Sequence, residues 1–234
     1  MPEASLLRPL EPSVQDPQPN GICGGSPSPP HPPCLNQADK AILRRQLLQK
    51  RRALPAQLRR QAEQAVCRHY RQAGWLLRFH RIGLFMASGS EISTLPLVNM
   101  LLAAGKHVFF PLIPHEPRLR KLWFTRLHAD ARWVENRHGI AELTHAHAVR
   151  ARDLDLLLMP LAGFDAAGNR LGMGGGYYDA SLAYLRIRHH WRTPTTVGLA
   201  YACQESLTPL PVDPWDVPLS ALLTESGVRI FRKR

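Results

Sequence analysis

Residues 170–179 read Arg-Leu-Gly-Met-Gly-Gly-Gly-Tyr-Tyr-Asp, which places four glycines between the guanidinium of Arg170 and the carboxylate of Asp179. Because glycine has no Cβ and tolerates positive φ, backbone N–H groups in this stretch can turn toward an anion and approach it closely. The apolar residues 154–159 come before the stretch and predict a buried strand, and residues 177–190 predict a helix after it. A glycine loop between a strand and a helix is typical of a phosphate site.

Two candidate ligands for a polyphosphate flank the glycines. Arg170 offers a planar fork of donors that fits phosphate oxygens, and Asp179 can hold Mg²⁺ against them. The alternative is a flexible glycine turn that only joins a strand to a helix. The stretch lacks the Lys-Ser/Thr pair of the P-loop and the acidic residue of the dinucleotide fingerprint. We favour the phosphate site because arginine, glycines and aspartate occur together.

The same stretch follows Phe164-Asp165 and Gly168-Asn169, and this order resembles the signature of the 5-formyltetrahydrofolate cyclo-ligase (methenyltetrahydrofolate synthetase) family. From the residues alone we expect an α/β domain with a phosphate-binding loop. The resemblance adds a Rossmann-like fold, with a mixed, mostly parallel sheet flanked by helices in a single domain. It also implies a ligase of folate and one-carbon metabolism. Such an enzyme uses ATP and Mg²⁺ to cyclise 5-formyltetrahydrofolate to 5,10-methenyltetrahydrofolate, releasing ADP and phosphate.

The chain of 234 residues divides by composition near residue 37. Residues 1–36 hold ten of the 21 prolines, with almost no apolar periodicity. Such a segment buries too little surface to offset the entropy of ordering it, so we expect a disordered N-terminal extension. The resemblance does not cover this extension. Residues 37–234 are expected to form the cyclo-ligase-like domain.

The charge and the cysteines limit the partners and the compartment. Residues 1–39 have a net charge of −3, so the remainder has +15 within the total of +12. This excess favours anionic partners, which include nucleic acid, acidic membranes, ATP and folate polyglutamates. No apolar run approaches the ~18–20 residues of a membrane span, residues 1–18 do not read as a signal peptide, and the four cysteines lack metal-ligand spacing. We therefore expect a cytoplasmic protein without a membrane partner. We also expect a monomer, although no sequence feature addresses the oligomeric state.

Helical periodicity begins at Asp39, and a second helix is predicted from Pro55 to about Tyr70. Lys40 and Arg44 are four residues apart, which puts both on one helix face. This Lys-x-x-x-Arg resembles the ATP-contacting segment of the family, which implies the same role here. The other arginines up to residue 81 are interpreted as surface residues, with a nucleic-acid patch as the alternative.

A strand–helix–strand pattern follows at residues 82–111. It predicts a strand at 82–87, a helix with Thr94 as N-cap that ends near Gly105, and a parallel strand at 107–111. The loop around Glu91 is similar to the family's Glu-Ile/Val-x-Thr segment, which implies that Glu91 binds the folate substrate. The alternative is an acid that only favours the helix N-terminus.

The next segment contains a strand at residues 122–127, then Trp133 and residues 136–142, which resemble the family's Trp…Gly-Ile-x-Glu-Pro segment. Leu143 stands where the family usually has proline. Trp133 is a candidate for stacking on the pterin ring, with simple packing as the alternative. His145 and His147 lack a third ligand nearby and are interpreted as surface histidines.

The C-terminal part predicts strands at residues 195–201 and 228–231, with a proline-rich segment between them. Asp213 and Asp216 lie in that segment, where aspartate is also common for local turn hydrogen bonds. The resemblance matches Asp216 to the family's second magnesium-binding aspartate and Asp179 to the first.

The expected site residues fall into four groups by role. The catalytic residues are Lys40, Arg44 and Arg170. The ATP-binding residues are Lys40, Arg44, Arg170, Leu171, Gly172, Met173, Gly174, Gly175, Gly176, Tyr177 and Tyr178. The folate-binding residues are Glu91, Trp133, Met173, Gly174, Gly175, Gly176 and Tyr177. The Mg²⁺ ligands are Asp179 and Asp216.

Two other functions fit the residues. The first is a basic, non-catalytic RNA-binding module with the same fold, whose binding would fall steeply with salt. The second is an ATP-dependent enzyme of this fold that acts on another small carboxylate. The presence of Glu91, Asp179 and Asp216 favours an enzyme over the binding module, and nucleic acid is not the expected partner.

Overall fold

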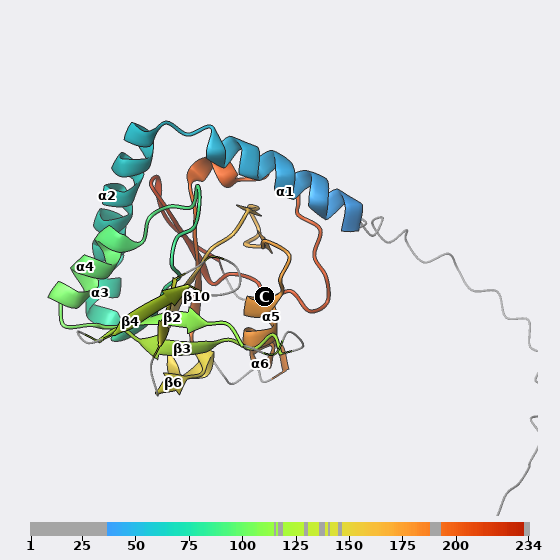
Figure 1. The fold of residues 1–234 in the computed structure, drawn as a ribbon. Coiled ribbons are helices and arrows are strands. Elements are labelled where there is room, and N and C mark those ends of the chain that lie inside the picture. Colours follow the sequence, from blue (N-terminus) through green and yellow to red (C-terminus); the bar gives the residue numbers. More distant parts are fainter. Residues whose placement is uncertain are drawn as a thin grey trace, which may run out of the picture. The chain divides into compact units, whose positions relative to one another are not determined.

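An eight-stranded sheet forms the centre of the compact unit Leu35–Arg234 (Figure 1). The computed structural model describes residues 37–114, 116, 119–128, 131–135, 139, 141–144, 147–187 and 193–231. The strands lie in the order β12-β11-β10-β7-β1-β2-β3-β6. In that order they span Gly227–Ile230, Ala221–Thr224, Thr195–Leu199, Leu156–Met159, Arg81–Gly83, His107–Leu112, Trp123–Arg126 and Ala148–Val149.

The five strands from β11 to β2 run parallel, and antiparallel strands flank them on both sides. In the parallel part, the chain enters at β1, moves to β2 on one side, and then crosses to β7, β10 and β11 on the other. This is the order 2-1-3-4-5 of doubly wound sheets, which reverses direction beside the first strand. The expected mixed, mostly parallel sheet and the parallel unit formed by β1 and β2 are confirmed.

Both faces of the sheet are buried, as the alternation of β7 shows. Leu156 and Leu158 pack into one core with helices α2 and α4, while Leu157 and Met159 pack into a second core with α5. Successive strand side chains point to opposite faces, so a fully apolar strand requires cover on both sides. The helices and single turns span the following ranges: α1 Gln37–Arg52, α2 Ala56–Gln72, α3 Trp75–Arg78, α4 Leu95–Ala103, η1 Ala151–Asp153, α5 Tyr177–Leu182, α6 Tyr184–Ile187 and η2 Ala202–Gln204.

The strand predicted at residues 82–87 is shorter than expected. The N–H of Leu84 still donates to the carbonyl of Phe109 (2.8 Å), but β1 ends at Gly83 and the chain then leaves the sheet. A Cβ on Gly83 would lie 2.6 Å from Cδ1 of Leu157, so glycine permits the close packing of β1 on its neighbour. Thr94 precedes α4 as predicted, but its hydroxyl donates to the carbonyl of Phe85 (2.9 Å) and does not cap the helix.

The prediction of one continuous helix at residues 177–190 is wrong. The described part of this range is helical, but it forms two short helices, α5 and α6. The hydroxyl of Ser181 donates to the carbonyl of Tyr177 at 2.6 Å and accepts the N–H of Leu122 at 2.8 Å. Serine that bonds back to the carbonyl four residues earlier tends to bend a helix. The first helix accordingly ends at Leu182, and residues 188–190 lie outside the described residues.

Two small antiparallel pairs were not predicted. One pairs β4 (Arg132–Glu135) with β5 (Ala141–Thr144), and the other pairs β8 (Gly163–Phe164) with β9 (Arg170–Leu171). The second pair carries Arg170 into the glycine loop, so it positions the start of the motif.

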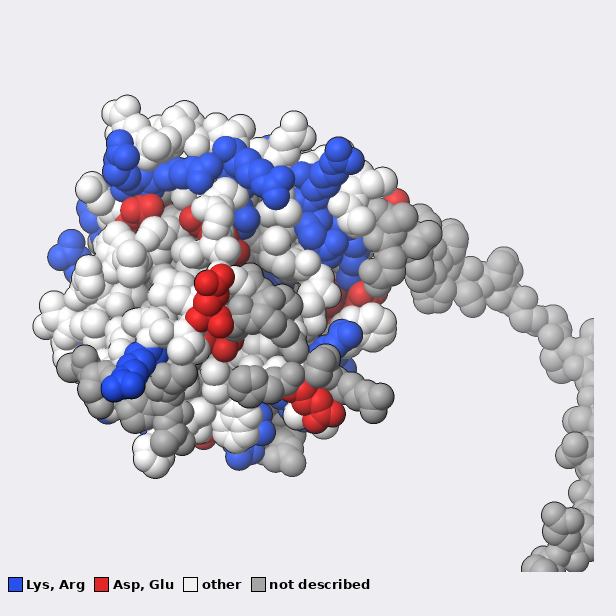
Figure 2. Space-filling view, in the orientation of Figure 1, with Lys and Arg blue, Asp and Glu red and all other residues white. Residues whose placement is uncertain are grey.

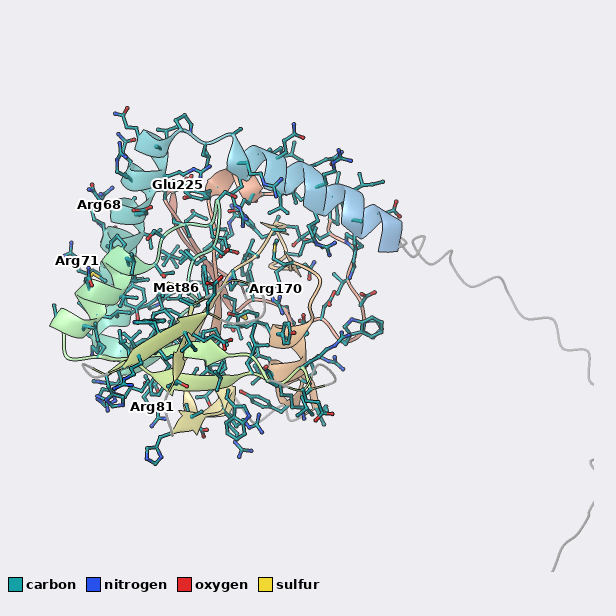
Figure 3. The ribbon with its side chains drawn as sticks, in the orientation of Figure 1. Arg68, Arg71, Arg81, Met86, Arg170 and Glu225 are labelled. Carbon is teal, nitrogen blue, oxygen red and sulfur yellow. The ribbon has the colours of Figure 1, made fainter. Side chains whose placement is uncertain are left out.

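Basic side chains cover the outer surface of α1 and α2. Figure 2 shows them along the α1–α2 side of this face, and Figure 3 shows Arg68 and Arg71 pointing away from α2. Arg45 and Arg60 are also exposed, as expected for surface arginines. Within α1, Leu47 and Leu48 are buried, whereas Ile42 is exposed.

The predicted extension at residues 1–36 lies outside the described residues, so its disorder stays a prediction. Leu35–Arg234 forms one compact unit. None of the described helices is both long enough and apolar enough to span a membrane.

Candidate active site

A cavity of about 910 Å³ opens at the carboxyl ends of the parallel strands. Phe85, Met86 and Glu91 line it after β1, Ile113 after β2, and Pro160 after β7. β1 and β7 are the neighbours between which the strand order reverses, and ligands of doubly wound folds bind at this crevice. The volume is within the range of about 300–1,000 Å³ found for small-molecule sites.

The glycine loop forms one wall of this cavity. Residues 172–176 all line it, and Gly174 and Gly176 have φ values of +103° and +67°. Backbone with these φ values favours glycine, which explains the composition of the loop. Met173 is 53% exposed and also lines the cavity. The helix that follows, α5, has only six residues, so the groups of this wall that could hold an anion are chiefly the loop amides and Arg170.

The turn before the loop depends on Asp165, the aspartate of the Phe-Asp pair in the motif. Its buried carboxylate accepts hydrogen bonds from the N–H groups of Ala167 and Asn169 (both 2.9 Å), from Nδ2 of Asn169 (2.9 Å) and from the N–H of Leu210 (3.0 Å). These bonds fix the turn between β8 and β9. This part of the motif is therefore structural and sets the position of Arg170.

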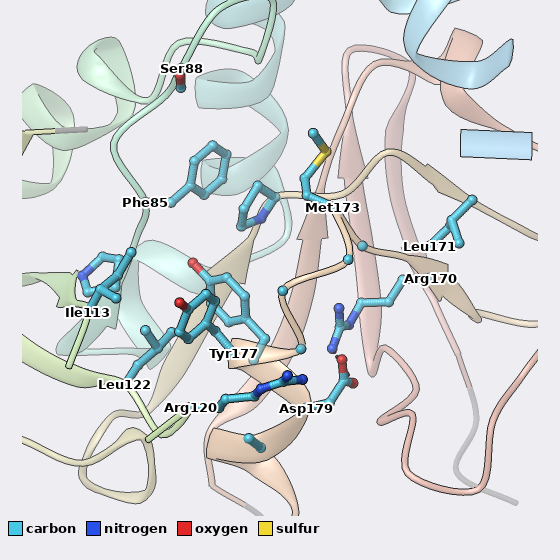
Figure 4. A pocket seen from close by; sticks show the side chains of 18 of the residues that line it. Phe85, Ser88, Ile113, Arg120, Leu122, Arg170, Leu171, Met173, Tyr177 and Asp179 are labelled. Carbon is cyan, nitrogen blue, oxygen red and sulfur yellow. Dashed lines mark hydrogen bonds and ion pairs between the residues drawn. The ribbon is translucent and has the colours of Figure 1, made fainter. Parts of the chain in front are cut away.

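Arg170 and Asp179, the two ends of the motif, form an ion pair. Figure 4 shows the guanidinium facing the carboxylate, and the atoms joined are Nη2 of Arg170 and Oδ1 of Asp179. The Arg170 side chain is only 4% exposed, and its Nε has no hydrogen-bond partner within the described part of the chain. Asp179 also accepts the N–H of Val217 at 3.1 Å. A buried donor beside a cavity is available to an anionic ligand.

Lys40 reaches the same cavity from α1. Its Nζ donates to Oδ2 of Asp213 (2.7 Å) and to Oδ2 of Asp216 (3.1 Å). Burial lowers the pKa of Lys40, but hydrogen bonds and charge from the two aspartates outweigh it and raise the pKa above its usual value. Lys40 is therefore a fixed positive charge. The family resemblance predicted that Asp216 and Asp179 are ligands of the same Mg²⁺. The hydrogen bond from the N–H of Val217 to Asp179 brings their two segments together.

Arg44 joins α1 to the glycine loop. Its Nε donates to the carbonyl of Gly172 at 2.7 Å. Lys40 and Arg44 both line the cavity, so the expected shared helix face is confirmed. Arg44 also holds the loop against α1, a structural role that the sequence did not indicate.

The prediction that the remaining arginines of the first two helices lie on the surface is wrong for Arg51. It is 5% exposed and lines the cavity, and its Nη1 lies 3.8 Å from Oε1 of Glu91. Arg51 follows Arg44 by seven residues, which returns it to the same helix face, so periodicity could have identified it. Burial raises the pKa of Glu91, and a hydrogen bond from the N–H of Ser88 and the charge of Arg51 partly offset this shift.

The cavity has an apolar side and a charged side. In Figure 4, Phe85, Ile113 and Leu122 lie on one side, with Arg170 and Asp179 on the other and Tyr177 between them. Tyr178 also lines the cavity, and burial raises the pKa of its hydroxyl, which stays neutral. This arrangement suits a ligand with a flat ring at one end and an anionic group near the other.

Trp133 does not line the cavity, in contrast to the other expected site residues. In the β4–β5 hairpin it pairs with Leu143, and Val134 pairs with Glu142. Paired residues share a face and neighbours alternate, so Trp133 lies on the face of buried Leu143, opposite Glu142, which lines the cavity. The Trp133 ring packs edge-on against Phe110, with centroids 5.4 Å apart. Its stacking role stays a prediction.

Some cavity residues were not singled out from the sequence. Met86, Arg120, Glu142 and Trp215 line the cavity along with Arg51. Apart from Arg51, only Glu142 had a signal, because it ends the segment that resembles the family. Of the two alternating histidines, His145 lies outside the described residues and His147 is exposed.

Comparison with known proteins agrees with this geometry. Residues 36–225 match the 5-formyltetrahydrofolate cyclo-ligase family. The chain belongs to this family. The match begins just before α1 and ends just after β11, so it includes Lys40, the glycine loop and Asp216.

The matches to two relatives of this cyclo-ligase family member extend over nearly the whole length of each relative. The 5-formyltetrahydrofolate cyclo-ligase of Escherichia coli K12 is 37% identical over 183 residues, which are 77% of this chain and 97% of the relative. The enzyme of the same name from Haemophilus influenzae is 35% identical over 193 residues, 81% of this chain and 99% of the relative.

The fold of this chain is similar to that of a solved structure. The NMR structure of 5,10-methenyltetrahydrofolate synthetase from Aquifex aeolicus superposes with a TM-score of 0.69 and 29% identity. It covers 83% of this chain and 94% of the other. The predicted single-domain architecture and family are thus confirmed, and the comparisons give no support to the non-catalytic RNA-binding alternative.

Proposed function

We propose that this protein is a ligase that uses ATP and Mg²⁺ to cyclise 5-formyltetrahydrofolate to 5,10-methenyltetrahydrofolate, with release of ADP and phosphate. The observation that supports this most directly is the set of residues that line one cavity. The glycine loop, Lys40, Arg170, Asp179 and Glu91 all line it, although they come from separate parts of the chain. Membership of the cyclo-ligase family supplies the reaction.

In this proposal the charged side of the cavity binds the triphosphate of ATP. The amides of residues 172–176 cradle its oxygens, while Lys40, Arg44 and Arg170 offset its negative charge. Phosphoryl transfer depends on positioning and on charge stabilisation, which are the properties of this wall. Leu171, Tyr177 and Tyr178 lie next to the loop and line the space for the rest of the nucleotide.

The carboxylates of the cavity fit Mg²⁺. Among the described residues no group of three or more His, Cys, Asp or Glu forms a protein-only metal cage. Mg²⁺ in nucleotide sites is usually bound through one or two carboxylates together with phosphate oxygens and water, and Asp179 and Asp216 provide two. We propose that these two hold the ion. When bound, it supplies positive charge that neutralises the phosphates.

The apolar side of the cavity is proposed to bind the pterin ring of the folate. Glu91 accepts hydrogen bonds from ring N–H groups, because an ionised carboxylate is only an acceptor. Tyr177, Met173 and residues 174–176 place the formyl group near the phosphate site. This keeps both substrates in contact with the same loop.

The reaction needs no nucleophile from the protein. The formyl oxygen takes the γ-phosphoryl group from ATP, and ADP leaves. N10 of the folate then attacks the formyl carbon and loses its proton, and the carbon–oxygen bond breaks to release phosphate. The carbon keeps its bonds to N5 and N10, so the product is the methenyl bridge. Lys40, Arg44 and Arg170 act by stabilising the charge that moves between these oxygens.

We also propose that the protein works in the cytoplasm as a monomer. Cys67 and Cys203 are free thiols, which suits a reducing compartment. The proposal does not require a nucleic-acid or membrane partner.

The test is to mix the full chain with 5-formyltetrahydrofolate, ATP and Mg²⁺ and to follow the near-ultraviolet absorbance of the methenyl product. We expect a rise that needs all three components. A folded protein that gives no rise with this folate, but hydrolyses ATP with another small carboxylate, would favour the second enzymatic alternative. RNA binding without ATP consumption would favour the binding module.

A further inference from the structure

Arg51 connects α1 to the loop that carries Glu91. Its Nε donates to Oγ of Ser90 at 2.9 Å, and its Nη1 lies 3.8 Å from Oε1 of Glu91. The same Nη1 donates to the carbonyl of Leu161 at 3.5 Å, just beyond β7. One buried guanidinium therefore contacts the chain after both β1 and β7, the two strands that flank the cavity opening.

The carboxylate of Glu91 is held from two directions. The N–H of Ser88 donates to Oε2 at 3.0 Å, and Oε1 faces Arg51. The Glu91 side chain is largely buried but lines the cavity. Burying a charge is costly unless the charge is paired or hydrogen-bonded, so Glu91 depends on both partners.

We propose that Arg51 is a positioning residue for the folate end of the cavity. It fixes loop 88–91 against α1, so that the Glu91 carboxylate is presented to the pterin ring in one orientation and in its charged form. This role rests on the proposed function. Nothing requires Arg51 to touch either substrate.

The position of Arg51 on α1 gives this contact a second consequence. Arg51 follows Lys40 by eleven residues, which is about three helical turns on one face and roughly 16 Å along the axis. Lys40 and Arg44 lie toward the phosphate side, and Arg51 holds the folate loop. α1 thus acts as a rigid spacer between the two substrate sites.

The charge state of Glu91 provides a readout of this role. Among the described residues, the ionisable groups that interact with Glu91 are Arg51 on α1 and Tyr178 on α5. The backbone N–H of Ser88 donates a hydrogen bond to the Glu91 carboxylate. Tyr178 stays neutral because burial raises its pKa. Burial raises the pKa of Glu91, and Arg51 opposes that rise. Removing Arg51 therefore raises the pKa further and protonates more of Glu91 at a given pH.

The experiment compares Arg51→Gln and Arg51→Lys with the wild type and with Arg45→Gln, an exposed control on the same helix. For Arg51→Gln we expect the KM for 5-formyltetrahydrofolate to rise about tenfold, because a buried charge loses its partner. The KM for ATP should stay within about twofold, since the phosphate ligands are unchanged. The acid limb of kcat/KM for folate should move to higher pH in Arg51→Gln. Arg51→Lys, which keeps the charge, should return it toward the wild-type position.

In folded Arg51→Gln, a lower kcat at every pH together with a rise in both KM values, or an unchanged folate KM, would overturn the proposal. A double-mutant cycle with Glu91→Gln covers the case in which Arg51→Gln does not fold. Arg51→Lys should raise the folate KM in the wild-type background but change it less than about twofold in Glu91→Gln. Equal effects in both backgrounds would contradict the role.

Wild-type turnover tests the proposed function, whereas the comparison of variants tests Arg51, so the two can fail separately. NMR titration of ¹³C-labelled Glu91 gives a readout without turnover. We expect its pKa to rise in Arg51→Gln. An unchanged titration would contradict the electrostatic part of the proposal even in an active enzyme.

Discussion

Asp179 accepts a hydrogen bond from the N–H of Val217 at 3.1 Å, which joins the end of the glycine motif to the proline-rich segment before β11. Arg170 is the ionic partner of Asp179, and Asp216, the residue before Val217, is bonded to Lys40. A continuous set of contacts therefore runs from the glycine loop to α1. It brings two carboxylates and two cations to one side of the cavity.

Replacing Asp179 by Asn tests the proposed metal role. The amide oxygen still accepts the Val217 N–H, but the buried guanidinium of Arg170 loses its ionic partner, so we also expect the free energy of unfolding to fall. The lost negative charge weakens Mg²⁺ binding, and we expect kcat to fall by about a hundredfold or more. Kinetics over a range of Mg²⁺ concentrations measure this. Glu63→Gln on α2, away from the cavity, is the control, and a normal Mg²⁺ dependence in Asp179→Asn would exclude Asp179 as a ligand.

Asp213 is predicted to position Lys40. It makes the shorter of the two hydrogen bonds to Nζ, 2.7 Å against 3.1 Å for Asp216. In Asp213→Asn the ammonium stays charged but is less restrained, so we expect the KM for ATP to rise about three- to tenfold with kcat largely kept. Asp216→Asn should lower kcat as well, because it also removes a proposed metal ligand. Equal effects of the two variants on kcat would show that their roles are not distinct.

The glycine loop offers a matched pair of substitutions. Gly174 has φ +103° and a Cβ there would touch nothing within 4 Å, so the cost of alanine is backbone strain of about 1–2 kcal/mol. Gly172 has ordinary φ, and its Cβ would meet Nη1 of Arg170 at 3.5 Å, an ordinary contact. We expect Gly174→Ala to lower the unfolding free energy and raise the KM for ATP more than Gly172→Ala does. Urea unfolding and steady-state kinetics measure both, and the reverse order would contradict the loop geometry.

Trp133 packs on Phe110 outside the cavity lining, so we expect Trp133→Ala to act on stability. Removing the partly exposed ring should lower the unfolding free energy by about 1–2 kcal/mol, mostly through lost contacts with Phe110. The KM for 5-formyltetrahydrofolate should stay within about twofold. An increase of more than about tenfold in a folded protein would show instead that Trp133 stacks on the bound pterin.

Structural features that have a local signal could be predicted from the sequence. The apolar run of β7, the strand–helix–strand unit around α4 and the glycine motif each give a local signal. The shared face of Lys40 and Arg44 also follows from helical spacing. These features indicate an α/β domain with a phosphate-binding loop, whereas the mixed, mostly parallel sheet and the choice of Glu91 and Asp216 as site residues came from the family resemblance.

Features that depend on distant contacts could not be predicted. Helical spacing puts Arg51 on the same face as Arg44, but the reason for its burial, the contact with the loop at Glu91, is not visible in the sequence. The break between α5 and α6 coincides with the bonds of Ser181, which connect to Leu122 from another element. The face of Trp133 was set by its register with Leu143, which a single-residue error would reverse.

The proposed reaction is tested most directly by following the formyl oxygen. Formyl-¹⁸O 5-formyltetrahydrofolate is incubated with ATP, Mg²⁺ and the full chain, and the methenyl product and released phosphate are measured together. We expect one phosphate per methenyl product, with the label in that phosphate, and no product without ATP. Unlabelled phosphate, or no product from folded protein, would contradict it.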